Sequence, residues 1–295
     1  MASFKAFVQW FPPARLPLAN GFVMAAGGLG ALVATAPVEA ALELTDWRGI
    51  FIALAVLAML VSAALILVVP EHESAGQGRE TFGGQIAGLL QVLRSPTFWR
   101  IAPVTTLSQA SFLSIQGLWA GPWLRDVGGL ARDQVANSLF WIAAAMVAGF
   151  LSLGGLTERL SRHGLRPLNL AIGGMMLFMG VQALIVASAP LPPLALWMAF
   201  GFLGTSGILP YAVLSQSFPR ELAGRCNTSL NLLVFVTAFA GQWGMGAVIN
   251  HWPLATAAGG VEPGYAETGY DLAFGLALGL QLLALLWLLR TRPAS

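Results

Sequence analysis

Residues 136–189, ANSLFWIAAAMVAGFLSLGGLTERLSRHGLRPLNLAIGGMMLFMGVQALIVASA, decide the class of fold. They contain two apolar runs, 136–156 and 167–189, joined by a short segment that carries three arginines. A helix needs about 20 mostly apolar residues to cross a bilayer, and both runs reach that length. The runs are continuous and do not alternate with a period of two. They therefore predict membrane helices and not the strands of a membrane barrel.

The same pattern extends over all 295 residues of the chain. Hydrophobic residues make up 57% of it and charged residues 9%, whereas a soluble domain has about 25% charged residues. The mean hydropathy is +0.73. The sequence therefore predicts an all-α polytopic membrane protein with about eight transmembrane helices, at residues 18–42, 48–70, 98–123, 136–156, 167–189, 192–215, 227–250 and 270–289.

The basic residues are sorted to one side of these spans. If the spans alternate in direction, one side receives only three of the 15 Lys and Arg, namely Arg48, Arg125 and Arg132. The other side receives the remaining 12: Lys5, Arg15, Arg79, Arg94, Arg100, Arg159, Arg162, Arg166, Arg220, Arg225, Arg290 and Arg292. Positive charge is retained in the cytoplasm. We therefore expect a multi-pass protein of the cytoplasmic membrane, in contact with the lipid bilayer, with both termini cytoplasmic.

The composition argues against several other classes of protein. A net charge of +2 is too small to indicate a nucleic-acid partner, and one cysteine, Cys226, excludes an internal disulfide. The three histidines lie far apart without metal-ligand spacing, and no catalytic constellation stands out. We expect no enzyme, catalytic residue, metal or cofactor.

Residues 1–36 resemble a signal peptide only in part. Their positive region is long, and Pro37 follows the Ala-Thr-Ala that resembles a cleavage site. We therefore predict that this segment is not cleaved and remains as a membrane span.

The sharpest local motif lies between the two spans quoted first. It reads Gly-Gly-Leu-Thr-Glu-Arg from Gly154 to Arg159, and basic residues follow it. Small glycines let helix ends approach closely, and a carboxylate beside guanidinium groups can form charge-assisted bonds. A basic loop that obeys the topology rule would explain the arginines but not the Gly-x-Leu-x-acid-Arg order. We predict a conformational latch formed by Gly154, Glu158, Arg159, Arg162 and Gly164.

This motif resembles one of the major facilitator superfamily, in the loop between the second and third helix of each half, with Glu158 in place of the usual Asp. Segments 46–51 and 218–225 are similar to two other connections of that family. The resemblance implies a partial major-facilitator fold. Residues 1–70 would be a remnant of the N-terminal bundle (the end of helix four, with helices five and six). Residues 71–97 would be a cytoplasmic linker, and 98–295 a complete C-terminal six-helix bundle.

The resemblance also implies a function. It indicates a secondary transporter, or permease, that moves a small organic solute by alternating access, with helices one to three and most of helix four missing from this chain. The alternative is a non-transporting membrane fragment, or a half-transporter that needs a partner chain to supply complementing N-terminal helices. The substrate class does not follow from the fold.

Polar residues inside the predicted spans are candidates for lining a substrate path. The span 98–123 has the densest series, in which Gln109 and Gln116 lie two turns apart on one face and Trp119 adjoins Gln116. The alternative for these side chains is hydrogen bonding between helices. The candidates for the substrate path are Gln109, Gln116, Trp119, Tyr211, Asn231 and Gln242.

Overall fold

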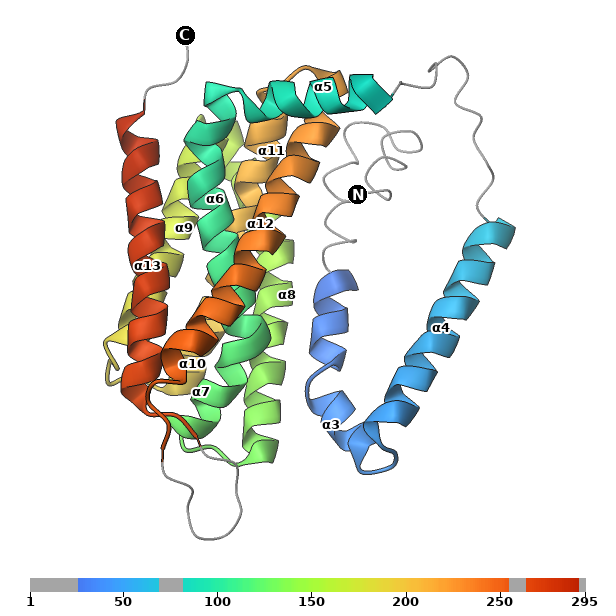
Figure 1. Ribbon diagram of the computed structural model, residues 1–295, viewed down its shortest axis with the longest axis vertical. Coiled ribbons are helices and arrows are strands. Elements are labelled where there is room, and N and C mark those ends of the chain that lie inside the picture. The colour runs from blue at the N-terminus through green and yellow to red at the C-terminus, as the bar shows by residue number, and fades with distance from the viewer. Residues whose placement is uncertain (1–25, 69–81, 255–263, 292–295) are drawn as a thin grey trace.

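The computed structural model describes residues 26–68, 82–254 and 264–291, which form a bundle of long helices (Figure 1). Residues 26–33 are helical. The following elements are α3 (Ala36–Leu42), α4 (Trp47–Val68), α5 (Phe82–Leu93), α6 (Pro96–Ser114), η2 (Ile115–Trp119), α7 (Ala120–Asp126), α8 (Arg132–Arg162), α9 (Pro167–Val186), α10 (Pro193–Gly204), η3 (Thr205–Ile208), α11 (Leu209–Gln216), α12 (Arg220–Ile249) and α13 (Glu267–Arg290). The predicted all-α class is confirmed.

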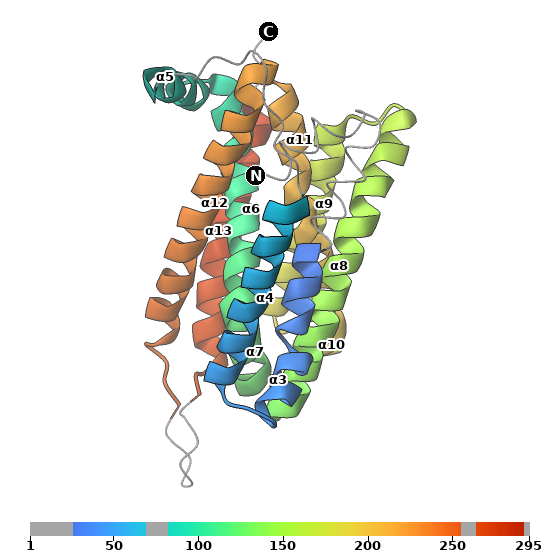
Figure 2. The same ribbon diagram turned by 90° about the vertical axis from the view of Figure 1, so that its right-hand side faces the viewer.

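Six passes build the main bundle: α6–α7, α8, α9, α10–α11, α12 and α13 (Figures 1 and 2). Helix α5 lies across one end of the bundle (Figure 1). Among the described residues, six helices are long and apolar enough to cross a membrane, namely Trp47–Val68, Arg132–Thr157, Pro167–Val186, Pro193–Gln216, Leu222–Ile249 and Glu267–Arg290.

Three of the eight predicted spans depart from a continuous α-helix among the described residues. The span 98–123 is divided by a π-helical turn, η2, which precedes Pro122. The span 18–42 begins outside the described residues, and the part that is described is interrupted at Ala34 and Thr35. In both places a proline follows, and proline lacks the backbone N–H that continues an α-helix. Pro210 similarly follows the 3₁₀ turn η3, whereas Pro103 lies inside α6.

The helix directions place the described arginines as the charge pattern predicted. Arg94, Arg159, Arg166, Arg225 and Arg290 lie at the end where α5 crosses the bundle, which we call the Arg-rich end. The opposite, Arg-poor end carries the arginines near the start of α4, the end of α7 and the start of α8. The sorting of charge between the two ends of the bundle is therefore a property of the fold.

The core of the bundle has two parts. An aromatic part includes Phe112, Phe178, Trp197 and Phe200, and an aliphatic part gathers side chains from α6, α9, α12 and α13. Helices α8 and α10 approach closely: a Cβ at Gly201 would lie 2.6 Å from the Ile142 carbonyl oxygen. Glycine is required there because any side chain would push the two helices apart.

The N-terminal helices pack less extensively. A Cβ at Gly28 would lie 2.8 Å from Val147 Cγ2, so this helix rests on α8. Arg132 Nε and Glu39 Oε1 form an ion pair at 2.7 Å, which joins the start of α8 to α3. Helix α4 has no buried residue. A helix that is apolar all round and unburied in the protein is suited to contact with lipid.

Candidate functional site

The predicted substrate-path residues begin with Gln109 on α6. Its side chain packs against Gly207 of η3, where a Cβ would lie 2.7 Å from Gln109 Nε2. Gln109 is buried, with only 9% of its surface exposed, yet its amide makes no hydrogen bond with any described residue. Gly207, in the 3₁₀ turn η3 between α10 and α11, thus leaves the space that this amide occupies.

Gln116 lies within η2 and is half-buried. Its Nε2 is 3.6 Å from Met146 Sδ on α8, and sulfur is a weak acceptor. Its Oε1 is buried and has no hydrogen-bond partner among the described residues. An unpaired buried amide carbonyl costs about 1–3 kcal/mol, and a donor from outside this part of the chain would relieve that cost.

Gln116 and Trp119, which the sequence predicted to adjoin, make their hydrogen bonds to different helices. Trp119 Nε1 donates to the Gln242 backbone oxygen on α12 at 3.3 Å, and its ring lies against Gly246. A π turn holds more residues per turn than an α turn, so residues three apart diverge around the axis. Gln116 therefore faces α8 while Trp119 faces α12.

The remaining candidates join α11 and α12. Tyr211 Oη donates to Asn231 Oδ1 at 3.5 Å, a long hydrogen bond, and both side chains are half-buried. The Gln242 side chain lies near η2, because a Cβ at Gly117 would be 3.6 Å from Gln242 Nε2. The structure thus distributes the six candidates over α6–η2, α11 and α12, with Trp119–Gln242 and Tyr211–Asn231 as contacting pairs.

A second polar cluster lies deeper in the bundle. Gln182 and Gln281, 2% and 0% exposed, exchange hydrogen bonds of 3.1 and 2.9 Å between α9 and α13. Ser111 Oγ on α6 donates to Gln182 Oε1 at 3.0 Å. Because its polar groups are paired and buried, this cluster holds three helices together and does not resemble a ligand site. The sequence analysis did not single out Gln281, although a glutamine in the middle of an apolar span was a usable signal.

The predicted latch residues are arranged differently from the expectation. Gly154 to Arg162 belongs to the last turns of α8 and is not a loop. A Cβ at Gly154 would meet no described residue within 4 Å, so among these residues this glycine makes no close helix approach. Gly164 follows the helix with φ +89°, which an L side chain rarely adopts. The side chains of Glu158 and Arg162 lie outside what the structure describes, so the latch remains a prediction.

A buried carboxylate at the Arg-poor end was not among the predicted site residues. The Asp126 side chain is 2% exposed and accepts hydrogen bonds from Arg125 Nε at 2.6 Å, the Tyr265 N–H at 3.0 Å and Tyr270 Oη at 2.7 Å. Burial raises the pKa of its carboxyl, but the three hydrogen bonds outweigh burial and hold the pKa below its ordinary value. Asp126 thereby connects α7 to α13.

Two comparisons with known proteins bear on the family of this chain. The chain is 23% identical over 251 residues to the multidrug resistance protein MdtM of Salmonella typhimurium (strain LT2), which covers 81% of this chain and 58% of that protein. The chain thus spans just over half the length of this curated relative. Residues 1–242 match the sequence model of the Major Facilitator Superfamily. Since that match covers most of its length, this chain belongs to the major facilitator superfamily.

Proposed function

We propose that the chain forms part of a secondary transporter, and not of an enzyme, that moves a small organic solute across the cytoplasmic membrane by alternating access. In this proposal the polar side chains of α6–η2, α11 and α12 line one wall of the solute path, which continues to α8 at Gln116. The observation that carries the proposal is the buried Gln116 Oε1, which has no hydrogen-bond partner among the described residues and lies in a π turn. π turns often mark functional positions in helices.

The chemistry of this wall suggests the class of solute. The candidate side chains are neutral amides, a phenol and the half-buried indole of Trp119. An unpaired carbonyl acceptor suits a solute with N–H donors, and an indole face attracts an organic cation. The Salmonella relative is named a multidrug resistance protein, which supports the same choice. We therefore propose an apolar, drug-like organic cation.

The opposite wall of the path must come from further helices. The described face of α12 exposes a stripe of large apolar residues, spaced three or four apart and 58–74% exposed: Leu232, Phe235, Val236, Phe239 and Trp243. In this proposal complementing N-terminal helices pack on that stripe, so transport needs them, whereas solute binding to the Gln116 wall does not.

Binding is tested with the purified chain in lipid nanodiscs and ethidium, a flat apolar cation with amino groups, as the probe. Gln116→Leu removes the carbonyl at similar size and should weaken binding several-fold, as measured by fluorescence anisotropy. Gln91→Leu on α5 is the matched control and should bind as the unchanged chain does. Equal affinity of the Gln116→Leu variant would remove this wall from the solute path.

Transport is tested separately in a chimera in which the N-terminal helices of the Salmonella relative precede this chain. Ethidium efflux from cells that express the chimera should fall with the same Gln116→Leu substitution. A chimera that binds ethidium at Gln116 but never exports it would favour the non-transporting fragment.

A further inference from the structure

Helix α5 is fixed to the Arg-rich end of the bundle by one of its faces. Gly88 and Val92 are buried on that face, and the Arg225 guanidinium of α12 lies directly over Gly88, where a Cβ would collide with it. Glycine at 88 is therefore what lets α5 lie against α12. The helix crosses the ends of the passes and does not run parallel to them (Figure 1).

The other face of α5 is apolar and uncovered. Ile86, Leu89 and Leu90 follow one another at helical spacing and are 42%, 39% and 42% exposed. A helix with this arrangement at the end of a membrane bundle lies in the interface, with its apolar face toward the acyl chains. The segment 82–100, FGGQIAGLLQVLRSPTFWR, contains two arginines, Arg94 and Arg100, and no acidic residue.

Two tryptophans mark the headgroup level beside α5. Trp99 Nε1 donates to the Leu93 carbonyl at the end of α5 at 2.7 Å, and Trp287 Nε1 donates to the Trp99 carbonyl at 2.9 Å. Both side chains are about half exposed. Tryptophans gather at membrane–water interfaces, where one part of the ring is apolar and the N–H is bonded. The junction of α5 and α6 therefore lies among lipid headgroups.

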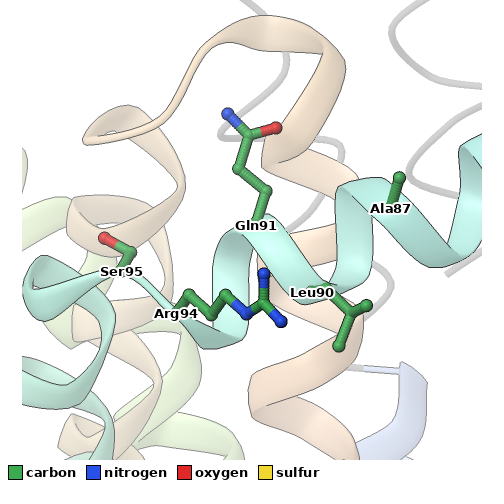
Figure 3. Close-up of a pocket in the computed structure, with 5 residues that line it drawn as sticks. All are labelled: Ala87, Leu90, Gln91, Arg94 and Ser95. Carbon is green, nitrogen blue, oxygen red and sulfur yellow. The ribbon is translucent and has the colours of Figure 1, made fainter.

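A pocket of about 410 Å³ opens at this junction (Figure 3). Its lining divides into an apolar part, Ala87 and Leu90, and a polar part, Gln91, Arg94 and Ser95. The Arg94 guanidinium lies alongside Leu90 (Figure 3) and makes no hydrogen bond or ion pair with any described residue. Ser95 precedes α6 but its side chain makes no capping bond. Three hydrogen-bonding groups thus share a pocket with apolar surface.

We propose that this pocket binds the headgroup of an anionic phospholipid. Arg94 supplies the cation for the phosphate, and the Ser95 hydroxyl and the Gln91 amide donate further hydrogen bonds. One acyl chain lies along Leu90 and continues over the exposed leucine face of α5. The apolar part of the lining selects a lipid over a soluble phosphate, and the unpaired guanidinium selects an anionic lipid over a zwitterionic one. The bound lipid fixes α5 in the plane of the interface.

The experiment measures lipids that are retained by the purified chain. The chain is reconstituted in nanodiscs of phosphatidylglycerol and phosphatidylcholine in equal amounts, extracted in mild detergent, and its retained lipids are counted by native mass spectrometry. The unchanged chain should retain phosphatidylglycerol at least threefold over phosphatidylcholine. Arg94→Gln should abolish this preference, and Arg94→Lys should keep part of it.

Arg290→Gln is the matched control, because Arg290 is an exposed arginine at the same end of the bundle. It removes the same charge and should leave the preference unchanged. If Arg94→Gln and Arg290→Gln lose the preference for phosphatidylglycerol equally, the effect is one of net charge and the proposal is overturned. An Arg94→Gln variant that keeps the full preference would overturn it as well. Displacement of the lipid by equimolar glycerol 3-phosphate would also overturn it, since the site would then be one for a soluble anion. Circular dichroism verifies that each variant is folded.

Discussion

Tyr270 Oη lies 2.7 Å from Asp126 Oδ2 and joins the first turn of α13 to the last residue of α7. These residues are 144 positions apart in the sequence. Gly264 makes room for the carboxylate, because a Cβ there would lie 2.8 Å from Asp126 Oδ1. The Arg-poor end of the bundle is thus held by hydrogen bonds to one buried charge.

Tyr270→Phe should destabilise the bundle by about 1.5–3 kcal/mol, the range for a hydrogen bond to a charged group. The free energy of unfolding is measured by titration with sodium dodecyl sulfate in mixed micelles. Tyr265→Phe is the control, because Tyr265 bonds to Asp126 through its backbone N–H, which the substitution keeps. Equal stability of Tyr270→Phe and the unchanged chain would contradict this role for the hydroxyl.

The pH dependence of stability follows from the lowered pKa of Asp126. A carboxyl whose pKa is depressed in the folded state stabilises the protein fully above its unfolded-state pKa, which is about 3.9. That contribution is lost as the pH falls from there through the folded-state pKa. The stability difference between the unchanged chain and Asp126→Asn should therefore be constant near neutrality and shrink below about pH 4.

The buried Gln182–Gln281 pair should show strong coupling. Gln281→Leu leaves the Gln182 amide short of partners in the core and should cost about 1–3 kcal/mol of unfolding free energy. Replacing both glutamines by leucine should recover much of that loss, since no amide then remains unpaired. The measurement is a double-mutant cycle in the same unfolding assay. Additive losses would show that the two amides do not act as a pair.

Membrane orientation is predicted by the arginine sorting. Reporter fusions after Ser74 and after Ser295 should both give a cytoplasmic signal, and a fusion after Gly128 should give a periplasmic one. Alkaline phosphatase and green fluorescent protein report the two sides. A periplasmic signal at Ser74 or Ser295 would contradict both the helix count and the orientation.

The motif at the end of α8 is predicted to act in conformational exchange and not in solute recognition. In the chimera with added N-terminal helices, Glu158→Ala should lower the transport rate and leave equilibrium ethidium binding nearly unchanged. Ser152→Ala is the control on the same helix, because the Ser152 hydroxyl bonds only to the Ala148 carbonyl within α8 among the described residues. Loss of binding in Glu158→Ala would assign the motif to recognition.

The sequence was sufficient to predict the helical class, most spans and the sorting of charge, because long apolar runs and arginine positions depend only on local composition. It was insufficient to predict the direction of side chains where a single turn departs from α-helical geometry. The π turn η2 directs Gln116 and Trp119 toward different helices. The sequence gives no sign of this turn apart from the proline that follows it, Pro122. The partners of Asp126 were also out of reach, since Tyr265 and Tyr270, which bond to it, lie 139 and 144 positions along the chain.

The π turn also fixes the rotation of the rest of its pass. A π turn holds one residue more than an α-helical turn, so it accommodates that residue without turning the helix beyond it. If the same residues, Ile115–Trp119, rewound as a regular α-helix, everything downstream would rotate by about 100°, the angle between successive α-helical residues. That rotation would turn Trp119 away from Gln242 and Asp126 away from Tyr270 together. The turn therefore ties the register of the proposed solute wall to that of the Arg-poor end. A pass that rewinds there keeps its sequence, its charge and its apolar span, and still loses both.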